Sequence, residues 1–193
     1  MIQTTPTLAA ADICLADVDD QAALEYCASN AKNSIPVDEI QYADRLEAAG
    51  RRRFLVSRMT LRQLIARHTN TAIASRSFSY QEGGKPYLRD GPHFSLSRHG
   101  SKAIFVVATT HPVGVDLESH RAVELAPDWT RRYASLATLV EICQRDGLSG
   151  ARAFMHGWVR FEAMAKCQGR QIRHELDRTS IFHDELSVES WDI

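Results

Sequence analysis

The stretch HFSLSRHGSKAIFVVATT, residues 93–110, decides the fold class more than any other part of the sequence. Two runs in it, residues 93–97 and 103–110, are short and rich in the β-branched and aromatic side chains that strands favour. The segment RHGSK between them contains a glycine and is typical of a turn. We therefore expect these two strands to form an antiparallel hairpin.

Upstream of the hairpin, RRRFLVSRMTLRQLIARH at residues 51–68 has the periodicity of a helix. One face of this helix carries Phe54, Leu61, Leu64 and Ile65. Arg58 and Arg62 lie one turn apart beside that face, where a solvated helix surface is the ordinary interpretation. Weaker patterns predict a strand at residues 13–18, a helix at 37–50 ended by a glycine, a strand at 75–80 and a turn at 81–88.

Downstream of the hairpin, VGVDLE at residues 113–118 predicts a further strand after a proline. Two helices are then expected, at residues 135–146 and from a cap at Ser149 to a stop at Gly169, and a last strand near residues 186–191. This order of elements favours an α+β protein over a repeat of βαβ units.

The composition excludes several classes of protein. The chain has 193 residues, enough for one domain or two small ones, and its net charge of −1 does not indicate bulk affinity for nucleic acid. The four cysteines show no metal or redox spacing, and the N-terminus lacks the basic start of a signal peptide. No apolar run is long enough to cross a bilayer. We expect a cytoplasmic protein without a membrane or nucleic-acid partner.

Asp116 and Glu118 are the first candidate functional residues. Residues i and i+2 of a strand point to the same face, so the two carboxylates would lie side by side. Such a pair repels unless a cation lies between its members, and hard oxygen ligands suit Mg²⁺. The alternative interpretation is that the strand leaves the core here and that both carboxylates simply face solvent.

Glu162 and Lys166 are the second candidate pair, four residues apart on the last long helix. Such pairs are usually exposed and contribute only a little stability. Here the helical step of 100° per residue places both beside the apolar stripe that contains Trp158. A carboxylate at the edge of a core needs a partner such as a metal ion or a lysine.

Cationic residues make a third set, and they suit an anion such as phosphate. Arg98 and His99 fall in the expected hairpin turn, where Gly100 allows backbone N–H groups to point outward as well. Many surface turns hold the same residue types without binding anything. No nucleophile elbow, zinc-protease motif, phosphate-binding lysine loop or dinucleotide fingerprint occurs in the sequence.

Taken together, the candidate residues lie in an ordered series of motifs: GKPYL at residues 84–88, FSLSRHG at 94–100, VGVDLE at 113–118 and WVRFEAMAKCQG at 158–169. This series resembles the 4′-phosphopantetheinyl transferases, the surfactin-synthetase-activating type in particular. The similarity runs from about residue 51 to residue 169. The last two motifs together are its most specific part.

The resemblance implies an enzyme that transfers the 4′-phosphopantetheine arm of coenzyme A to a serine of an acyl or peptidyl carrier protein and releases adenosine 3′,5′-bisphosphate. It also implies two similar α+β subdomains, residues 1–112 and 113–193, each a small antiparallel sheet packed on a helix, with the cofactor in the cleft between them and a shortened C-terminal half. A monomer or weak dimer is expected.

The same resemblance implies the site residues. Asp116, Glu118 and Glu162 would hold Mg²⁺ on the pyrophosphate, and Glu162 would take the serine proton. Lys166 would neutralise the pyrophosphate and assist the leaving group, which makes Asp116, Glu162 and Lys166 the expected catalytic residues. The expected cofactor-binding residues, Lys166 among them, also include Arg53, Arg58, Lys85, Ser97, Arg98 and His99.

The sequence departs from the family pattern at two informative positions. Arg98 stands where the family usually has histidine, and Phe161 stands where it usually has a lysine. A degenerate homologue that binds coenzyme A or a carrier protein without catalysis is therefore one alternative. An unrelated Mg²⁺-dependent phosphoesterase built on the same acids is another.

Overall fold

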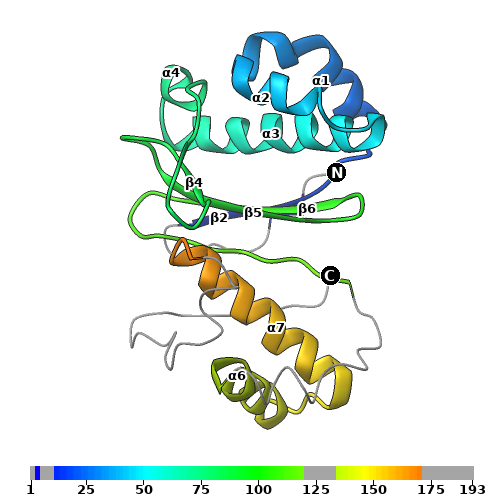
Figure 1. Ribbon diagram of the computed structural model, residues 1–193, viewed down its shortest axis with the longest axis vertical. Helices are drawn as coiled ribbons and strands as arrows, with labels where there is room; N and C mark the ends of the chain where they lie inside the picture. Colours follow the sequence, from blue (N-terminus) through cyan, green and yellow to red (C-terminus); the bar gives the residue numbers. More distant parts are fainter. Residues whose placement is uncertain (1–2, 5–10, 120–133, 171–193) are drawn as a thin grey trace.

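The computed structural model describes residues 3–4, 11–119 and 134–170 of the chain (Figure 1). Within these residues the fold is α+β, as predicted, with antiparallel sheets and helices. One layer of helices lies above the main sheet and a pair of helices lies below it. No helix among the described residues is long and apolar enough to cross a membrane.

The main sheet has four antiparallel strands in the order β1-β2-β6-β5. They are β1 (Gln3–Thr4), β2 (Ala11–Asp17), β5 (His93–His99) and β6 (Lys102–Ala108). The predicted hairpin is confirmed as β5 and β6, and the strand expected near residues 13–18 is confirmed as β2.

The hairpin turn is tighter than predicted. Strand pairing continues to His99, which lies opposite Lys102, so Arg98 and His99 belong to β5 and not to the turn. Gly100 makes this possible, because its φ of 59° is one that residues with a side chain rarely adopt. Arg98 and His99 consequently point to opposite faces of the sheet.

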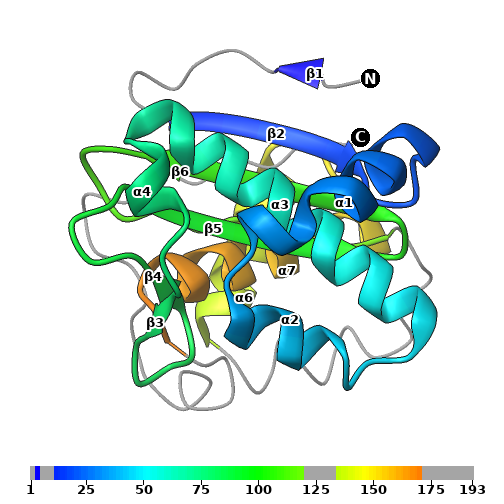
Figure 2. The same cartoon turned by 90° about the horizontal axis from the view of Figure 1, so that it is seen from above.

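The upper layer consists of α1 (Gln21–Ser34), α2 (Val37–Ala43), α3 (Ala48–His68) and the short α4 (Thr71–Ala74). Figure 2 shows α3 lying across the strands of the sheet. Its apolar face is buried as predicted, at Phe54, Leu61, Leu64 and Ile65. The sequence patterns did not indicate α1.

The predicted helix at residues 37–50 is confirmed only over its first half, because the chain leaves the helical path after Ala43 and starts a new helix at Ala48. Helix α2 ends at Ala43, and the carboxylate of Glu47 then accepts hydrogen bonds from the backbone N–H groups of Ala49 and Gly50. This cap starts α3, so Gly50 lies inside that helix instead of ending the previous one.

A small second sheet joins β3 (Ser79–Tyr80) and β4 (Pro86–Tyr87). The predicted turn between them is confirmed, whereas the predicted strand at residues 75–80 is shorter than expected. Gly83 in this turn packs so closely on the end of the last long helix that an added Cβ would lie 1.9 Å from the carbonyl oxygen of Gly169.

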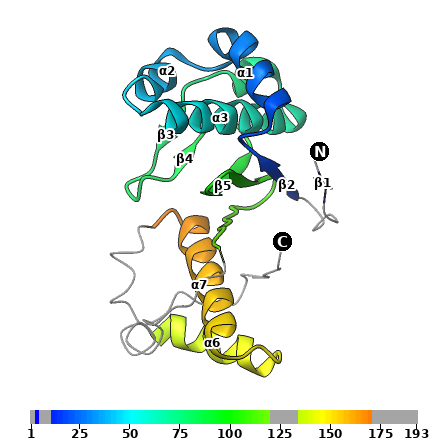
Figure 3. The same cartoon turned by 90° about the vertical axis from the view of Figure 1, so that its right-hand side faces the viewer.

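Below the main sheet lie α6 (Ala134–Arg145) and α7 (Gly150–Cys167), close to the two predicted helices (Figures 1 and 3). The two helices share a second hydrophobic cluster that includes Leu139, Phe154 and Phe161. Gly157 allows them to approach, since a Cβ there would lie 2.7 Å from Cγ2 of Val140.

The strand predicted at residues 113–118 is wrong. No backbone ladder pairs this segment with another described segment, and the N–H of Val115 donates instead to the side-chain hydroxyl of Ser95. The strand expected near residues 186–191 lies outside the described residues. The division into two similar subdomains at residue 112 stays a prediction.

Candidate active site

Residues 113–118, here called the acidic segment, cross below the sheet between β5 and α7. Gly114 lets the segment lie directly on the helix, because a Cβ at that position would be 2.0 Å from the carbonyl oxygen of Ala163 and 2.4 Å from the amide nitrogen of Cys167. This contact brings Asp116 and Glu118 to the side chains that α7 presents toward the sheet.

Three carboxylates gather there, from Asp116, Glu118 and Glu162. Each can offer one oxygen such that all three oxygens lie within 4.8 Å of one another. Their side chains are 2%, 21% and 15% exposed, respectively. The sequence expectation that the acidic pair faces Glu162 therefore agrees with the geometry, although the segment is not a strand.

Lys166 supplies the nearest positive charge. Its ammonium group contacts Oδ1 of Asp116 directly, donates to the hydroxyl of Ser97 at 3.0 Å, and lies 3.9 Å from Oε2 of Glu162. Ser97 in turn donates to Oδ1 of Asp116 at 2.8 Å. Lys166 therefore contacts two of the three acids, Asp116 and Glu162.

The charge imbalance appears in the protonation of Glu162. Burial, and next the negative charge of Asp116, raise the pKa of Glu162 from 4.5 to about 7, and the charge of Lys166 opposes this rise. At neutral pH Glu162 can therefore gain or lose a proton readily, which is the property that a general base needs.

The cluster also has free capacity to hold a cation. Oδ2 of Asp116 is buried and has no hydrogen-bond partner among the described residues. A buried carboxylate oxygen without a partner is costly, and a bound cation would satisfy it. Three carboxylate oxygens at this separation fit a hard ion such as Mg²⁺.

Lys85 lies at the edge of this region, where it links three segments. Its ammonium group donates to the carbonyl oxygen of Val113 at 2.8 Å and to that of Cys167 at 2.9 Å. Burial lowers the pKa of Lys85. The side chain thus ties the turn between β3 and β4 to the acidic segment and to the end of α7, while its expected role in cofactor binding stays a prediction.

Arg98 lies on the other face of β5 and reaches α3, the helix that carries Arg58. The guanidinium of Arg58 is 3.3 Å from Oε1 of Glu39 and stacks on Phe54 and Phe78, and the Arg98 guanidinium is 5.8 Å from the Phe54 ring. Burial, and next the charge of Arg58, lower the pKa of Arg98. Two neighbouring arginines with one shared aromatic surface suit an anion.

The solvated-face interpretation of Arg58 and Arg62 is wrong. Arg62 is 4% exposed, pairs with Oε2 of Glu39 at 2.9 Å, and donates to the carbonyl oxygens of Ala74 and Arg76. Glu39 thus forms ion pairs with both arginines. The sequence patterns did not indicate its role, because its partners lie about 20 residues further along the chain.

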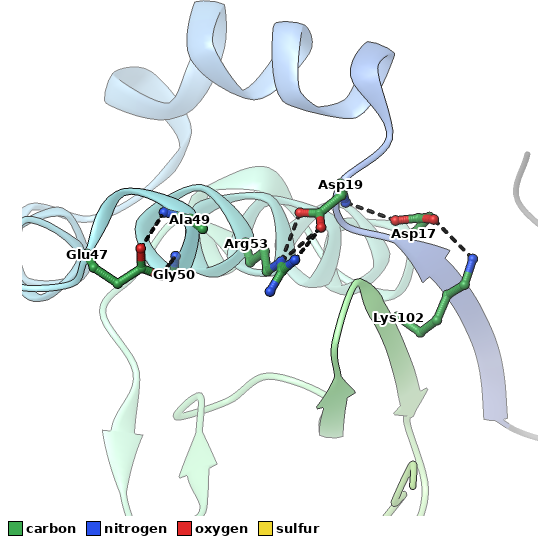
Figure 4. A network of polar contacts seen from close by, with 7 residues as sticks. All are labelled: Asp17, Asp19, Glu47, Ala49, Gly50, Arg53 and Lys102. Carbon is green, nitrogen blue, oxygen red and sulfur yellow. Dashed lines mark hydrogen bonds and ion pairs between the residues drawn. The ribbon is translucent and has the colours of Figure 1, made fainter. Parts of the chain in front are cut away.

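Arg53 is occupied elsewhere. Its guanidinium binds both carboxylate oxygens of Asp19 at 2.6–3.0 Å, beside the Asp17–Lys102 ion pair (Figure 4). His99, by contrast, lies at the acidic cluster, with Nδ1 3.2 Å from Oε2 of Glu118. The acids, Lys166, Ser97 and His99 are thus brought together, and Arg53 binds Asp19 instead.

Comparisons with known proteins place this arrangement in context. No protein-family model matches the chain. The chain is 32% identical over 166 residues to the L-aminoadipate-semialdehyde dehydrogenase-phosphopantetheinyl transferase of Eremothecium gossypii, an alignment that covers 82% of the chain and 58% of that protein. It is 27% identical over 131 residues to the 4′-phosphopantetheinyl transferase Sfp of Bacillus subtilis, covering 67% of the chain and 57% of Sfp.

The chain is a relative of the 4′-phosphopantetheinyl transferases. A putative 4′-phosphopantetheinyl transferase of Synechocystis matches as well, at 26% identity over 66% of the chain and 54% of that protein. The resemblance predicted from the motifs is therefore confirmed. The chain spans somewhat more than half the length of these curated relatives.

Proposed function

We propose that this relative of the 4′-phosphopantetheinyl transferases transfers the phosphopantetheine arm of coenzyme A to a serine of an acyl or peptidyl carrier protein. The observation that carries the proposal is the cluster of Asp116, Glu118 and Glu162 with Lys166. Three neighbouring acids with a single lysine beside two of them form an unfavourable group by themselves. They form a balanced one around a cation and a pyrophosphate.

Mg²⁺ would be held by Asp116, Glu118 and Glu162, and the unpartnered Oδ2 of Asp116 supports this assignment. When bound, the ion would neutralise the pyrophosphate of coenzyme A and the charge that develops as its bridging bond breaks.

The chain's own residues would carry the proton and the leaving group. Glu162, whose pKa is raised to about 7, accepts the proton of the carrier serine as its oxygen bonds to the phosphorus that carries the pantetheine arm. The bond from that phosphorus to the bridging oxygen breaks, and adenosine 3′,5′-bisphosphate leaves. Lys166 stabilises the charge on the departing phosphate.

The nucleotide end of coenzyme A would be held by cationic groups of residues 1–112, across a cleft from residues 113–193. Arg98 and Arg58 are the best supported of these, because they are neighbours and share the Phe54 surface. Arg53, Lys85 and the hydroxyl of Ser97 complete the proposed set, although each of them, like Arg58, already has a partner within the chain.

The proposed partner is a carrier protein, in a cytoplasmic setting and with the chain acting as a monomer or weak dimer. The name of the Eremothecium relative supports a protein substrate, since it names a dehydrogenase as that transferase's object.

One observation favours a second candidate, a homologue that binds without catalysis. Phe161 is 1% exposed and packs with Trp158 in the lower core, so the position that usually carries a lysine in the family offers no charge. The loss of this basic contact would lower the affinity for coenzyme A and leave the arrangement of the three acids unchanged.

Chromatographic detection of adenosine 3′,5′-bisphosphate tests these candidates. The proposed transfer predicts that this product forms when the chain, coenzyme A, Mg²⁺ and an apo carrier protein are present together, and that omission of the carrier stops it. Coenzyme A binding without product would favour the non-catalytic homologue. Product formation at the same rate with and without the carrier protein would favour a phosphoesterase.

A further inference from the structure

Alternate residues on the lower face of β5 each contact the acidic segment. The hydroxyl of Ser95 accepts the N–H of Val115 at 3.3 Å, and that of Ser97 donates to Oδ1 of Asp116 at 2.8 Å. His99 places Nδ1 3.2 Å from Oε2 of Glu118. Because residues i, i+2 and i+4 of a strand share one face, the three contacts form a regular series along the strand.

This series matters because the acidic segment has no backbone ladder among the described residues. In a strand, backbone pairing would fix the direction of each side chain. Here the directions of Asp116 and Glu118 depend on side-chain contacts and on the close packing of Gly114 against α7. A residue that contacts one of the carboxylates therefore helps to set its direction, and so the geometry of the proposed metal site.

His99 is firmly placed to do this. Its backbone pairs with Lys102 across the hairpin, and the ammonium of Lys102 is itself paired with Asp17 at 3.0 Å. The imidazole is 40% exposed, whereas Glu118 is 21% exposed. The contact engages one carboxylate oxygen of Glu118 and does not itself occupy the other.

We propose that His99 is a positioning residue that orients Glu118 for metal binding, and that it acts through this carboxylate instead of contacting the nucleotide. The proposal rests on the proposed function, since it takes Glu118 as a metal ligand. Outer partners of metal-ligating side chains commonly change metal affinity tenfold to a hundredfold when removed. Ser97 is a less informative position because its hydroxyl also accepts from Lys166.

The test measures metal binding directly, with Mn²⁺ as the probe. Free Mn²⁺ is followed by electron paramagnetic resonance as the ion is titrated into the full chain with coenzyme A and without a carrier protein. We expect His99→Ala to weaken Mn²⁺ binding about tenfold. His99→Asn keeps a donor near the position of Nδ1 and should restore most of that affinity. Lys102→Ala, at the paired position with its ammonium on Asp17, is the matched control and should bind Mn²⁺ like the wild type.

A double-variant comparison separates positioning from other roles. In a Glu118→Ala background, His99→Ala should cause no further loss of Mn²⁺ affinity, because the side chain that it orients is gone. An undiminished loss in that background, or a wild-type Mn²⁺ affinity in His99→Ala with weaker coenzyme A binding, would overturn the positioning role alone. A wild-type chain that binds no Mn²⁺ under these conditions would instead overturn the proposed metal-dependent function.

Discussion

Glu162 is the acid of the cluster whose pKa is raised, and this shift should make the stability of the chain depend on pH. Its pKa of about 7 in the folded chain lies above the ordinary value of 4.5, because burial and Asp116 disfavour the charged form. Glu162 therefore keeps its proton in the folded chain, and loses it in the unfolded chain, between about pH 4.5 and pH 7. Without metal, the contribution of Glu162 to the free energy of unfolding should fall as the pH rises through that window.

Glu162→Gln should abolish this loss. We expect the metal-free variant to match the wild type near pH 4 and to exceed it at pH 8 by up to about 3 kcal/mol, because glutamine carries no charge in the acidic cluster. Urea unfolding across this pH range measures the difference. Parallel stability profiles for the two proteins would contradict the raised pKa. Saturating Mg²⁺ should stabilise the wild type at pH 8 more than the variant.

Asp116→Asn probes the central ligand while preserving its shape. The variant should lose about a hundredfold in transfer rate at limiting Mg²⁺, because a charged ligand and the partner of Lys166 are both removed. Rates measured against Mg²⁺ concentration test this. Asp17→Asn, which alters a carboxylate paired with Lys102 away from the site, is the control. Turnover near that of the wild type at low Mg²⁺ would remove Asp116 from the metal site.

Arg98 should carry affinity for the 3′-phosphate of coenzyme A. Loss of a charge-assisted contact worth about 1.5–3 kcal/mol predicts that Arg98→Ala raises the Michaelis constant for coenzyme A about tenfold or more. The effect on 3′-dephospho-coenzyme A should be much smaller. Equal effects on the two substrates would place the 3′-phosphate elsewhere. Arginine stays charged at all working pH values, so the contact should persist between about pH 6 and 8.

Residue types and spacing predicted the acids and Lys166 but not the partners of the cations. Glu162 and Lys166 are one helical turn apart, so a periodicity argument finds them. The pairs Arg53–Asp19 and Arg62–Glu39 join residues 34 and 23 positions apart, and no local rule connects them. The contact of His99 with Glu118 was hidden for a further reason, because His99 was expected in a turn.

At the scale of elements, the sequence pattern of the acidic segment predicted the placement of its side chains but not its backbone structure. Alternation predicted correctly that Asp116 and Glu118 lie together, yet the predicted strand does not form. The segment is held by Gly114 against α7 and by side chains of β5. Such contacts are tertiary, so the sequence pattern of the segment alone could not distinguish them from strand pairing.

Gly114→Ala tests that arrangement. The added Cβ would lie 2.0 Å from the carbonyl oxygen of Ala163, so the segment must shift away from the helix and carry the carboxylates with it. We expect a lower melting temperature and a lower transfer rate together. Gly50→Ala is the matched control, because the nearest atom to its Cβ is the flexible carboxylate of Glu47 at 3.1 Å. Unchanged stability and rate in Gly114→Ala would show that the close packing is not needed.

At the scale of the whole molecule, the described residues form an upper α/β layer and a lower helical pair, joined by the acidic segment and by Lys85 (Figures 1 and 3). The α+β class and the hairpin were predictable because they depend on composition and alternation. The helix α1 was not, since only Cys27 and Ala31 of its residues are buried.

The intact mass of an apo carrier protein after incubation with this chain tests the central claim most directly. The chain spans somewhat more than half the length of its curated relatives, so the experiment asks whether these 193 residues perform the transfer. With coenzyme A and Mg²⁺ we predict that the carrier gains the mass of one phosphopantetheine group, and that a carrier whose acceptor serine is replaced by alanine gains nothing. A carrier of unchanged mass, under conditions in which a known transferase modifies it fully, would contradict the account.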